Sequence, residues 1–391
     1  MRKLSLTLAA AGLTMSLGAF AALPTDAAPF QLVIPNLKSG VDITLEGLLL
    51  QPSNSDLDYA VSGSAVRGTR GDFDNLPVTW TSAGKANVQS IDPQYNFGFR
   101  VGLGYTFAES GNDIQVSWTR FDQNDNDDFS VPNGHALQSR LIGADFSSFP
   151  NEFEIGGTEK VSSASSSVNT KLDAIDLDVG QYVDIGTRLR MRMFGGLRFA
   201  RVSSDLSTDF YSTEVNNSEG EITEVRLNEQ FNSKFTGVGP RVGVDSVYHI
   251  GSCFGVVARA AVGLLVGQTE TDSQFAYNAT THFREILAAE QNLSAKIDSS
   301  DSTRVVPVLD AKLGLNYSFT FENQSILTLE AGYQATQYID AIDRLDGGFS
   351  VASISDNKNI EREANLIQGQ AVRTTSGIGF SGPYLSLNWK V

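Results

Sequence analysis

The stretch that decides the fold is Tyr95–Phe107, which reads YNFGFRVGLGYTF. Every odd position in it holds a large apolar or aromatic residue, whereas the even positions hold Asn, Gly, Arg and Thr. A β-strand places alternate side chains on opposite faces, so it separates these two classes completely, and a helix would mix them. The same alternation recurs in Val305–Phe319. Both segments are therefore expected to be strands with one strongly apolar face.

Eight further segments share this period of two, which gives ten expected strands. They are Val41–Leu50, Asp113–Phe121, Leu172–Asp184, Arg188–Ser203, Phe235–Tyr248, Phe254–Gly267, Ile326–Gln337 and Gly377–Val391.

The connections between these strands alternate in length. Four are short: Ala108–Asn112, Ile185–Thr187, His249–Cys253 and Thr320–Ser325. Five are long: residues 51–93, 122–171, 204–234, 268–304 and 338–376. Short turns at one end and long loops at the other are typical of outer-membrane β-barrels. We therefore expect an all-β, transmembrane, antiparallel up-and-down barrel of about ten strands, or of twelve if a long loop contains another hairpin.

The N-terminus indicates export. Arg2 and Lys3 precede a largely apolar run to Leu17, and Ala19-Phe20-Ala21 provides the small residues of a cleavage site. This is the layout of a secretory signal peptide over residues 1–21, and an uncleaved membrane anchor is the alternative. The expected mature chain starts at about Ala22, with a periplasmic segment over 22–40 and the barrel over 41–391.

Composition excludes several classes of protein. A net charge of −16 argues against nucleic-acid binding, which needs a basic surface. After the N-terminus there is no apolar run long enough for a transmembrane helix. Acidic residues outnumber basic ones in each of the five long connections, so we expect a negative external surface that attracts cations. Aromatic residues are expected to form a girdle near the short turns: Phe107, Tyr248, Phe254, Tyr317, Phe319 and Trp389.

If the apolar face of the wall contacts lipid, the opposite face lines a lumen that carries both signs of charge. The expected lumen-lining charges are Arg100, Asp176, Asp178, Arg188, Arg190, Arg192, Arg198, Arg241, Arg259, Asp310, Lys312 and Glu330. Because a tight turn joins Leu172–Asp184 to Arg188–Ser203, the charges on these two strands are expected to pair. Two interpretations stay open: a water-filled constriction that selects ions, or salt bridges that seal a narrow barrel.

Other sites receive weaker support from the sequence. His135 or His282 could join loop aspartates in a protease site at the rim, but solvated loop histidines explain them more simply. The run Asp122–Asp128 resembles a calcium loop, yet Asp127 replaces the required Gly and Asn133 the closing Glu. Apolar residues between Phe283 and Ile297 fit one face of a short loop helix, which could also cover the mouth. We expect no catalytic residue, metal site or cofactor.

Cys253 is the only cysteine, so an intrachain disulfide is excluded. An odd cysteine in an exported protein indicates either an intermolecular disulfide or a buried, inert thiol.

Several stretches resemble the Legionella-type major outer membrane protein family. They are Ile43–Gly47 (ITLEG), Leu50–Ala60 (LQPSNSDLDYA), Phe97–Tyr105 (FGFRVGLGY) and Gly382–Leu387 (GPYLSL). The resemblance implies a porin-like barrel that is abundant in the bacterial outer membrane and exposed to host factors, with a disulfide between subunits as an option. It brings no catalytic residues.

The expected function is that of an outer-membrane porin for ions and small hydrophilic solutes, with a mild cation preference. The alternative is a non-conducting surface barrel whose loops bind host factors as an adhesin. Expected partners are outer-membrane lipid, the permeating ions and solutes, and further copies of the chain in a homo-oligomer.

Overall fold

The structure, a computed structural model, describes eleven segments of the chain: residues 32–66, 81–82, 87–131, 135–139, 161–216, 221–251, 253–283, 286–299, 301–322, 324–354 and 363–391. The expected signal peptide lies outside these residues. Among them, no helix is long and apolar enough to cross a membrane.

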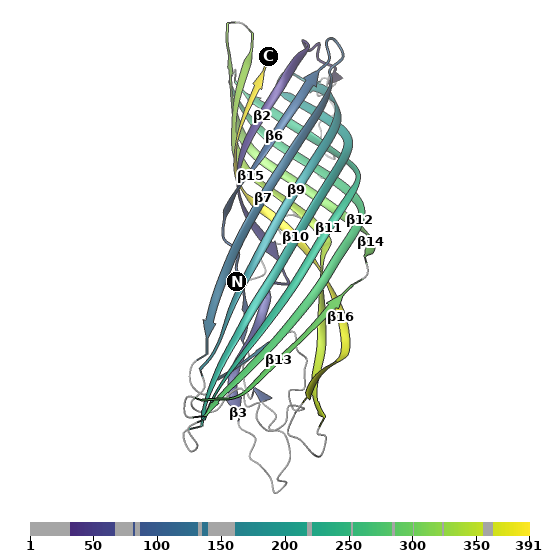
Figure 1. The fold of residues 1–391 in the computed structure, drawn as a ribbon. Helices are drawn as coiled ribbons and strands as arrows, with labels where there is room; N and C mark the ends of the chain where they lie inside the picture. The colour runs from purple at the N-terminus through teal and green to yellow at the C-terminus, as the bar shows by residue number, and fades with distance from the viewer. Residues whose placement is uncertain are drawn as a thin grey trace, which may run out of the picture.

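Ten long antiparallel strands close into a ring in the order β9-β10-β11-β12-β14-β15-β16-β2-β6-β7, and β7 pairs with β9 to complete it (Figure 1). The ring strands are β2 (Gly40–Asn54), β6 (Asn96–Thr106), β7 (Asn112–Ser130), β9 (Val161–Ile185), β10 (Leu189–Asn216), β11 (Glu221–Ile250), β12 (Phe254–Phe283), β14 (Ser302–Thr320), β15 (Ile326–Ile354) and β16 (Glu363–Lys390). Each of the ten expected strands is present, so the predicted barrel is confirmed. The alternative of twelve strands is wrong for the ring that the described residues form.

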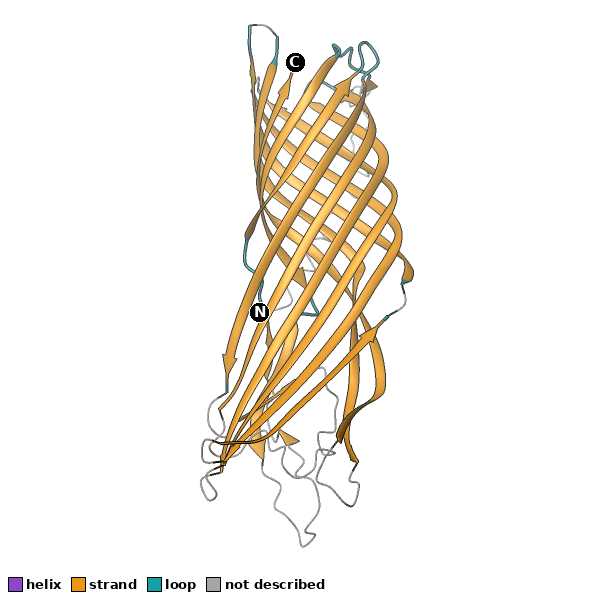
Figure 2. Cartoon of the chain, in the orientation of Figure 1, coloured by secondary structure: helices purple, strands orange, loops and turns teal. Residues whose placement is uncertain are grey.

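Six short strands lie outside this ring. β1 (Leu32–Val33) pairs with the end of β9, and β13 (Ile286–Asp298) pairs with β12. A small second sheet is formed by β3 (Asp58–Val66), β4 (Thr81–Ser82), β5 (Asn87–Ser90) and β8 (His135–Ser139). The short turns gather at the end of the barrel where the C-terminus lies, and the strands cross the wall obliquely (Figure 2).

The outer wall near the short turns is apolar, as the alternation predicts. Leu103, Val116, Leu177 and Leu197 all point outward and are exposed. The six aromatic residues expected in the girdle are likewise exposed, and Phe254 and Tyr317 stack edge to face with ring centroids 4.9 Å apart. In water such a surface would be unfavourable, so this part of the wall fits a lipid environment.

The strands extend further on the long-connection side than we expected. β10 runs for 28 residues and β12 for 30, so much of each expected loop is strand. Along β10 the phase of alternation continues, but the chemistry inverts: Arg192 and Arg198 point inward near the short turns, and Val202 and Leu206 point inward beyond them. The apolar outer face from which the strands were predicted covers only the part of the wall that fits lipid, the lipid-facing belt. The strands continue beyond this belt with polar outer faces, so their predicted ends came too early.

Two expectations about the loops are wrong. Phe283 ends β12, and Ile286–Asp298 form the strand β13 in place of a short helix, because the backbone of β13 pairs with the edge of β12. The acidic run Asp122–Asp128 belongs to β7 in place of a loop, so its carboxylates are divided between the two faces of the strand, Asp125 and Asp127 on the inner face and Asp122 and Asp128 on the outer face, and do not surround one ion. The inward Asp127 accepts a hydrogen bond from the Tyr59 hydroxyl at 2.8 Å, and burial together with this carboxylate raises the pKa of Tyr59.

Candidate functional site in the barrel lumen

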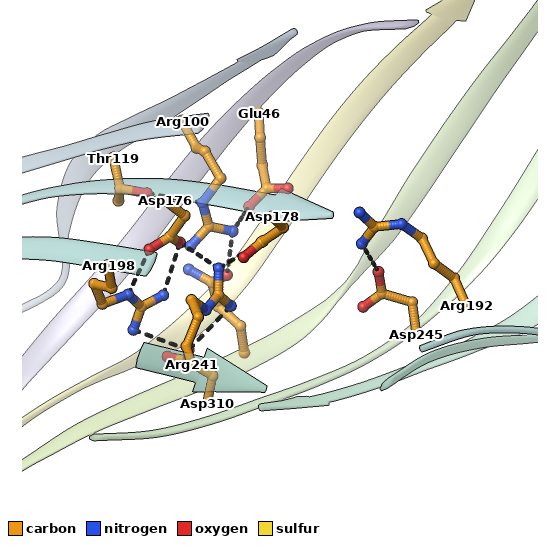
Figure 3. A network of polar contacts seen from close by, with 11 residues as sticks. Glu46, Arg100, Thr119, Asp176, Asp178, Arg192, Arg198, Arg241, Asp245 and Asp310 are labelled. Carbon is orange, nitrogen blue, oxygen red and sulfur yellow. Dashed lines mark hydrogen bonds and ion pairs between the residues drawn. The ribbon is translucent and has the colours of Figure 1, made fainter. Parts of the chain in front are cut away.

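The inner face of the lipid-facing belt carries charges that meet inside the barrel. The first group joins β9, β10, β11 and β14 (Figure 3). Arg198 donates to both oxygens of Asp176 at 2.6 and 2.8 Å, and its Nη1 lies 2.9 Å from Asp310 Oδ2. Arg241 Nη1 lies 2.8 Å from Asp176 and 2.9 Å from Asp178. Because β11 and β12 separate β10 from β14 in the ring, the Arg198–Asp310 pair spans part of the lumen.

The first group has space because the backbone of β10 carries a glycine beside the Asp178 carboxylate. Gly196 lies on β10 opposite Asp178, and a Cβ atom there would be 2.1 Å from the Leu177 carbonyl oxygen and 2.4 Å from Asp178 Oδ1. Any side chain at this position would displace the carboxylate from Arg241. Glycine is therefore required at position 196, because only a residue without a side chain leaves space for the Asp178 carboxylate beside β10.

A second group is centred on Glu46 of β2. Its two oxygens accept from Arg100 at 2.8 Å and from Lys312 at 2.6 Å. Lys312 lies on β14, which β15 and β16 separate from β2, so this contact also crosses the interior. Beside it, Glu330 accepts from Arg259 and from the Tyr384 hydroxyl, each at 2.7 Å.

A third group lies towards the short turns. Arg192 donates to Asp113 at 2.8 Å and to Asp245 at 3.1 Å, and it stacks on the ring of Phe194 at 5.0 Å. Arg241 stacks on the same ring at 5.1 Å, which joins this group to the first.

The structure brings eleven of the twelve expected lumen charges into ion pairs at the inner wall. Arg190 pairs with Asp184 at 2.7 Å next to the short turn. The exception is Arg188, which is exposed in the turn outside the lumen because the strand starts one residue later, at Leu189. The expected pairing between β9 and β10 is present, since Asp176 lies opposite Arg198 and Asp184 opposite Arg190.

These groups surround a cavity of about 170 Å³. Its charged lining contains six acidic and six basic residues, so neither sign dominates. They are Asp42, Glu46, Asp176, Asp178, Asp245 and Asp310, with Arg100, Arg192, Arg198, Arg241, Arg259 and Lys312. A cavity of this size and polarity holds several water molecules. It is the part of the described interior that suits ions or small polar solutes.

Beyond this cavity, an apolar layer fills the barrel, and sequence reasoning missed it. Side chains from nine of the ten ring strands contribute, and none is more than 4% exposed: Leu48, Leu50, Phe121, Leu172, Ala174, Ala200, Val202, Phe235, Leu265, Val306, Val308, Tyr338, Ala341, Ile342, Ile378, Phe380 and Tyr384. The Phe121 and Phe380 rings, from opposite sides of β2 and β6, lie 5.7 Å apart. An ion cannot cross such a layer without losing its hydration, so the described conformation is closed.

Still further out, the first long connection packs inside the mouth. Leu57, Tyr59 and Ala60 of this connection are buried against Leu206 and Val168 of the wall. Two layers thus separate the charged cavity from the outer end of the described strands. The sequence does contain a signal for these layers. Beyond the belt the alternation keeps its phase, but the inward positions, such as Val202 and Leu206 on β10, are apolar instead of charged.

Cys253 lies half-buried in the turn between β11 and β12, and its carbonyl oxygen accepts from the Ser318 amide at 2.9 Å. His135 and His282 lie on β8 and β12 respectively, in strands where we expected loops. No group of three or more residues able to hold a metal occurs among the described residues.

Comparison with known proteins decides the family. The model of the Legionella pneumophila major outer membrane protein precursor matches residues 33–391. The chain belongs to this family. As a family member it is a protein of the bacterial outer membrane, and the apolar belt of its wall is the surface that meets the lipid. No curated protein matches the chain.

Several solved structures are similar to this major outer membrane protein family member, and three of them follow. The outer membrane protease OmpT from Escherichia coli is 9% identical, with a TM-score of 0.36, over 92% of this chain and 100% of the other. The toluene transporter TodX from Pseudomonas putida is 6% identical, with a TM-score of 0.25, over 90% and 89%. A FadL homologue from Pseudomonas aeruginosa is 9% identical, with a TM-score of 0.21, over 90% of each chain. Likenesses this weak assign no activity to the chain.

Proposed function

We propose that this family member is an outer-membrane porin that gives ions and small hydrophilic solutes passive passage, with a mild preference for cations and no catalytic activity. The observation that carries the proposal is the charged cavity inside the lipid-facing belt, with six acidic and six basic residues around about 170 Å³. Balanced charges allow either sign of ion to be compensated inside the barrel. The acidic excess of the long connections supports the cation preference.

The apolar layer limits how such a pore conducts. Since the described conformation is closed at Phe121, Phe235 and Phe380, passage requires a conformational change in the outer half of the barrel. We therefore expect brief, discrete openings rather than a steady current.

The test is single-channel recording of the refolded mature chain in a planar bilayer under a salt gradient. We expect discrete steps and a cation-selective reversal potential. Lys312→Gln removes a positive charge from the cavity and is expected to increase the cation selectivity, whereas the matched change Lys171→Gln on the outer face, where Lys171 is 48% exposed, leaves it unchanged. A silent bilayer, with folding verified by heat-modifiable gel mobility, would overturn the porin proposal.

A second candidate is favoured by the same apolar layer: a permanently closed barrel whose external segments bind host or matrix components. Exchange of the long connections between this chain and a non-adhesive barrel separates the candidates. Adhesion that follows the connections, together with a silent bilayer, would support the closed barrel.

A further inference from the structure

β15 leaves the barrel wall part-way along its length. Its pairing with β14 ends at Tyr338, opposite Val308. Immediately afterwards, the register between β15 and β16 shifts between Tyr338 and Ile342, and Asp340 adopts a φ of 55°. A positive φ at a residue other than Gly is uncommon and marks a sharp change of chain direction. Beyond this bulge, β15 and β16 continue together as a hairpin that β14 no longer holds (Figure 1).

The base of this hairpin lies inside the barrel mouth. Residues 341–345 are all buried, although a strand in a barrel wall would show one face to the outside. Hydrogen bonds attach them to the inner faces of strands on another part of the ring. The Asp343 amide donates to Ser233 Oγ on β11 at 2.9 Å, and Ser273 Oγ on β12 donates to the Leu345 carbonyl at 2.8 Å.

Charged contacts hold the hairpin base in place. The Asp343 carboxylate is 0% exposed and accepts from Arg304 Nη2 of β14 at 2.8 Å and from Thr375 Oγ1 at 2.8 Å. Arg304 also donates to the Asp340 carbonyl at 3.0 Å, so one side chain joins the wall to the bulge and to the hairpin. On the other side, Arg344 lies 2.6 Å from Asp56, which follows β2.

We propose that residues 339–354 of β15 and 363–376 of β16 are the gate of the pore, that this part of the hairpin pivots at the bulge around Asp340, and that the Arg304–Asp343 contact holds it closed. The inference rests on the proposed porin function. Ala341 and Ile342 belong to the apolar layer, so movement of the hairpin removes two of its members and opens that layer to water. Movement breaks no backbone hydrogen bond between β14 and β15, since these strands do not pair beyond Tyr338, and the hydrogen bonds to β11 and β12 that it does break are those of Asp343 with Ser233 and of Ser273 with Leu345.

The test uses the full mature chain with Cys253→Ser as background. Asp343→Asn removes the charge of the contact, and Arg304→Gln does so from the other partner. Loss of a charge-assisted hydrogen bond is expected to raise the open probability about tenfold. Asp298→Asn, at a carboxylate that is 64% exposed on β13, is the matched control and leaves it unchanged. Because Ser273 Oγ donates to the Leu345 carbonyl, the pair Ser273→Cys and Leu345→Cys is expected to form a disulfide that locks the hairpin, so oxidation lowers the open probability and reductant restores it.

A second measurement keeps the gate separable from the porin function. Leu345→Cys alone, in the same background, reports hairpin movement through its rate of modification by a membrane-impermeant thiol reagent. We expect Asp343→Asn to accelerate this reaction about tenfold. Steady conductance that neither the lock nor Asp343→Asn alters would overturn the gate and leave the porin. A silent bilayer with accelerated modification would refute the porin while the hairpin still moves, and equal modification rates would overturn the gate.

Discussion

Replacement of Asp176 by Asn measures how dry the barrel interior is. The Asp176 side chain is 7% exposed and accepts three contacts of 2.6–2.8 Å from Arg198 and Arg241. Asn has the same shape but no charge, so both guanidinium groups would lose their shared counter-ion in a buried site. Removal of one partner from a buried ion pair costs about 3–5 kcal/mol of folding free energy. Because Asp310 still contacts Arg198, we expect a loss near the lower limit, about 3 kcal/mol.

The matched control is Glu270→Gln on the outer face. Glu270 lies 2.8 Å from Lys234, but its side chain is 53% exposed. Ion pairs in water contribute only about 0–1 kcal/mol, so the control should be nearly neutral. The two substitutions make the same chemical change at similar distances, but Asp176 is buried between two arginines whereas Glu270 is exposed beside one lysine.

The assay is urea unfolding of the chain after it has folded into lipid vesicles. Trp118 and Trp389 are suitable fluorescent reporters, because they are 40% and 45% exposed on the outer wall and would pass from lipid to water on unfolding. A double-mutant cycle with Arg198→Gln isolates the energy of the pair. If Asp176→Asn costs no more than Glu270→Gln, water screens the charges at this level, and the buried ion-pair network around Asp176 is refuted.

Three further predictions address packing, backbone approach and the thiol. Phe380→Ala is expected to cost about 3–5 kcal/mol of unfolding free energy, whereas Leu385→Ala on the lipid-facing wall costs less because it opens no interior cavity; equal losses in urea titrations would contradict the apolar layer. Gly196→Ala should impair folding, as measured by heat-modifiable gel mobility, while Gly263→Ala, where the nearest neighbour is 3.6 Å from the added Cβ, should fold normally; a fully folded Gly196→Ala barrel would show that Asp178 can move aside. For Cys253, an intermolecular disulfide stays a prediction: non-reducing gels of isolated envelopes should show a slower band that reductant and Cys253→Ser both remove, and identical mobility would exclude it.

The wall of this barrel was predictable because lipid requires an apolar outer face on every strand and tight turns set the register between neighbouring strands. Alternation identified all ten ring strands, and the tight turn after Ile185 fixed the register of β9 and β10. Once register is known, inward charges opposite each other are neighbours, which is why the pairs Asp176–Arg198 and Asp184–Arg190 could be expected.

Contacts across the lumen could not be predicted in the same way. Glu46 and Lys312 are 266 residues apart, and their distance depends on the tilt and stagger of the whole ring. The gate region was missed for another reason. Residues 341–345 lack alternation because they are buried on both sides, and neither a period of two nor a period of 3.6 describes a strand inside a barrel mouth.

Along a strand such as β10, the inward side chains change from charged to apolar although the same alternate positions keep pointing inward. The cause is that the medium outside the wall changes from lipid to water. Inside the belt, lipid surrounds the wall, so apolar side chains point outward and charges such as Asp310 and Lys312 must point inward and pair. Beyond the belt, water surrounds the wall, so along β10 the inward phase that carries Arg198 inside the belt now takes Val202 and Leu206 away from water. One consequence is that the barrier to permeation is the apolar layer, which lies between the charged cavity and the outer mouth of the barrel. Substitutions at the charges should therefore change selectivity, and substitutions in the apolar layer should change how often the pore opens.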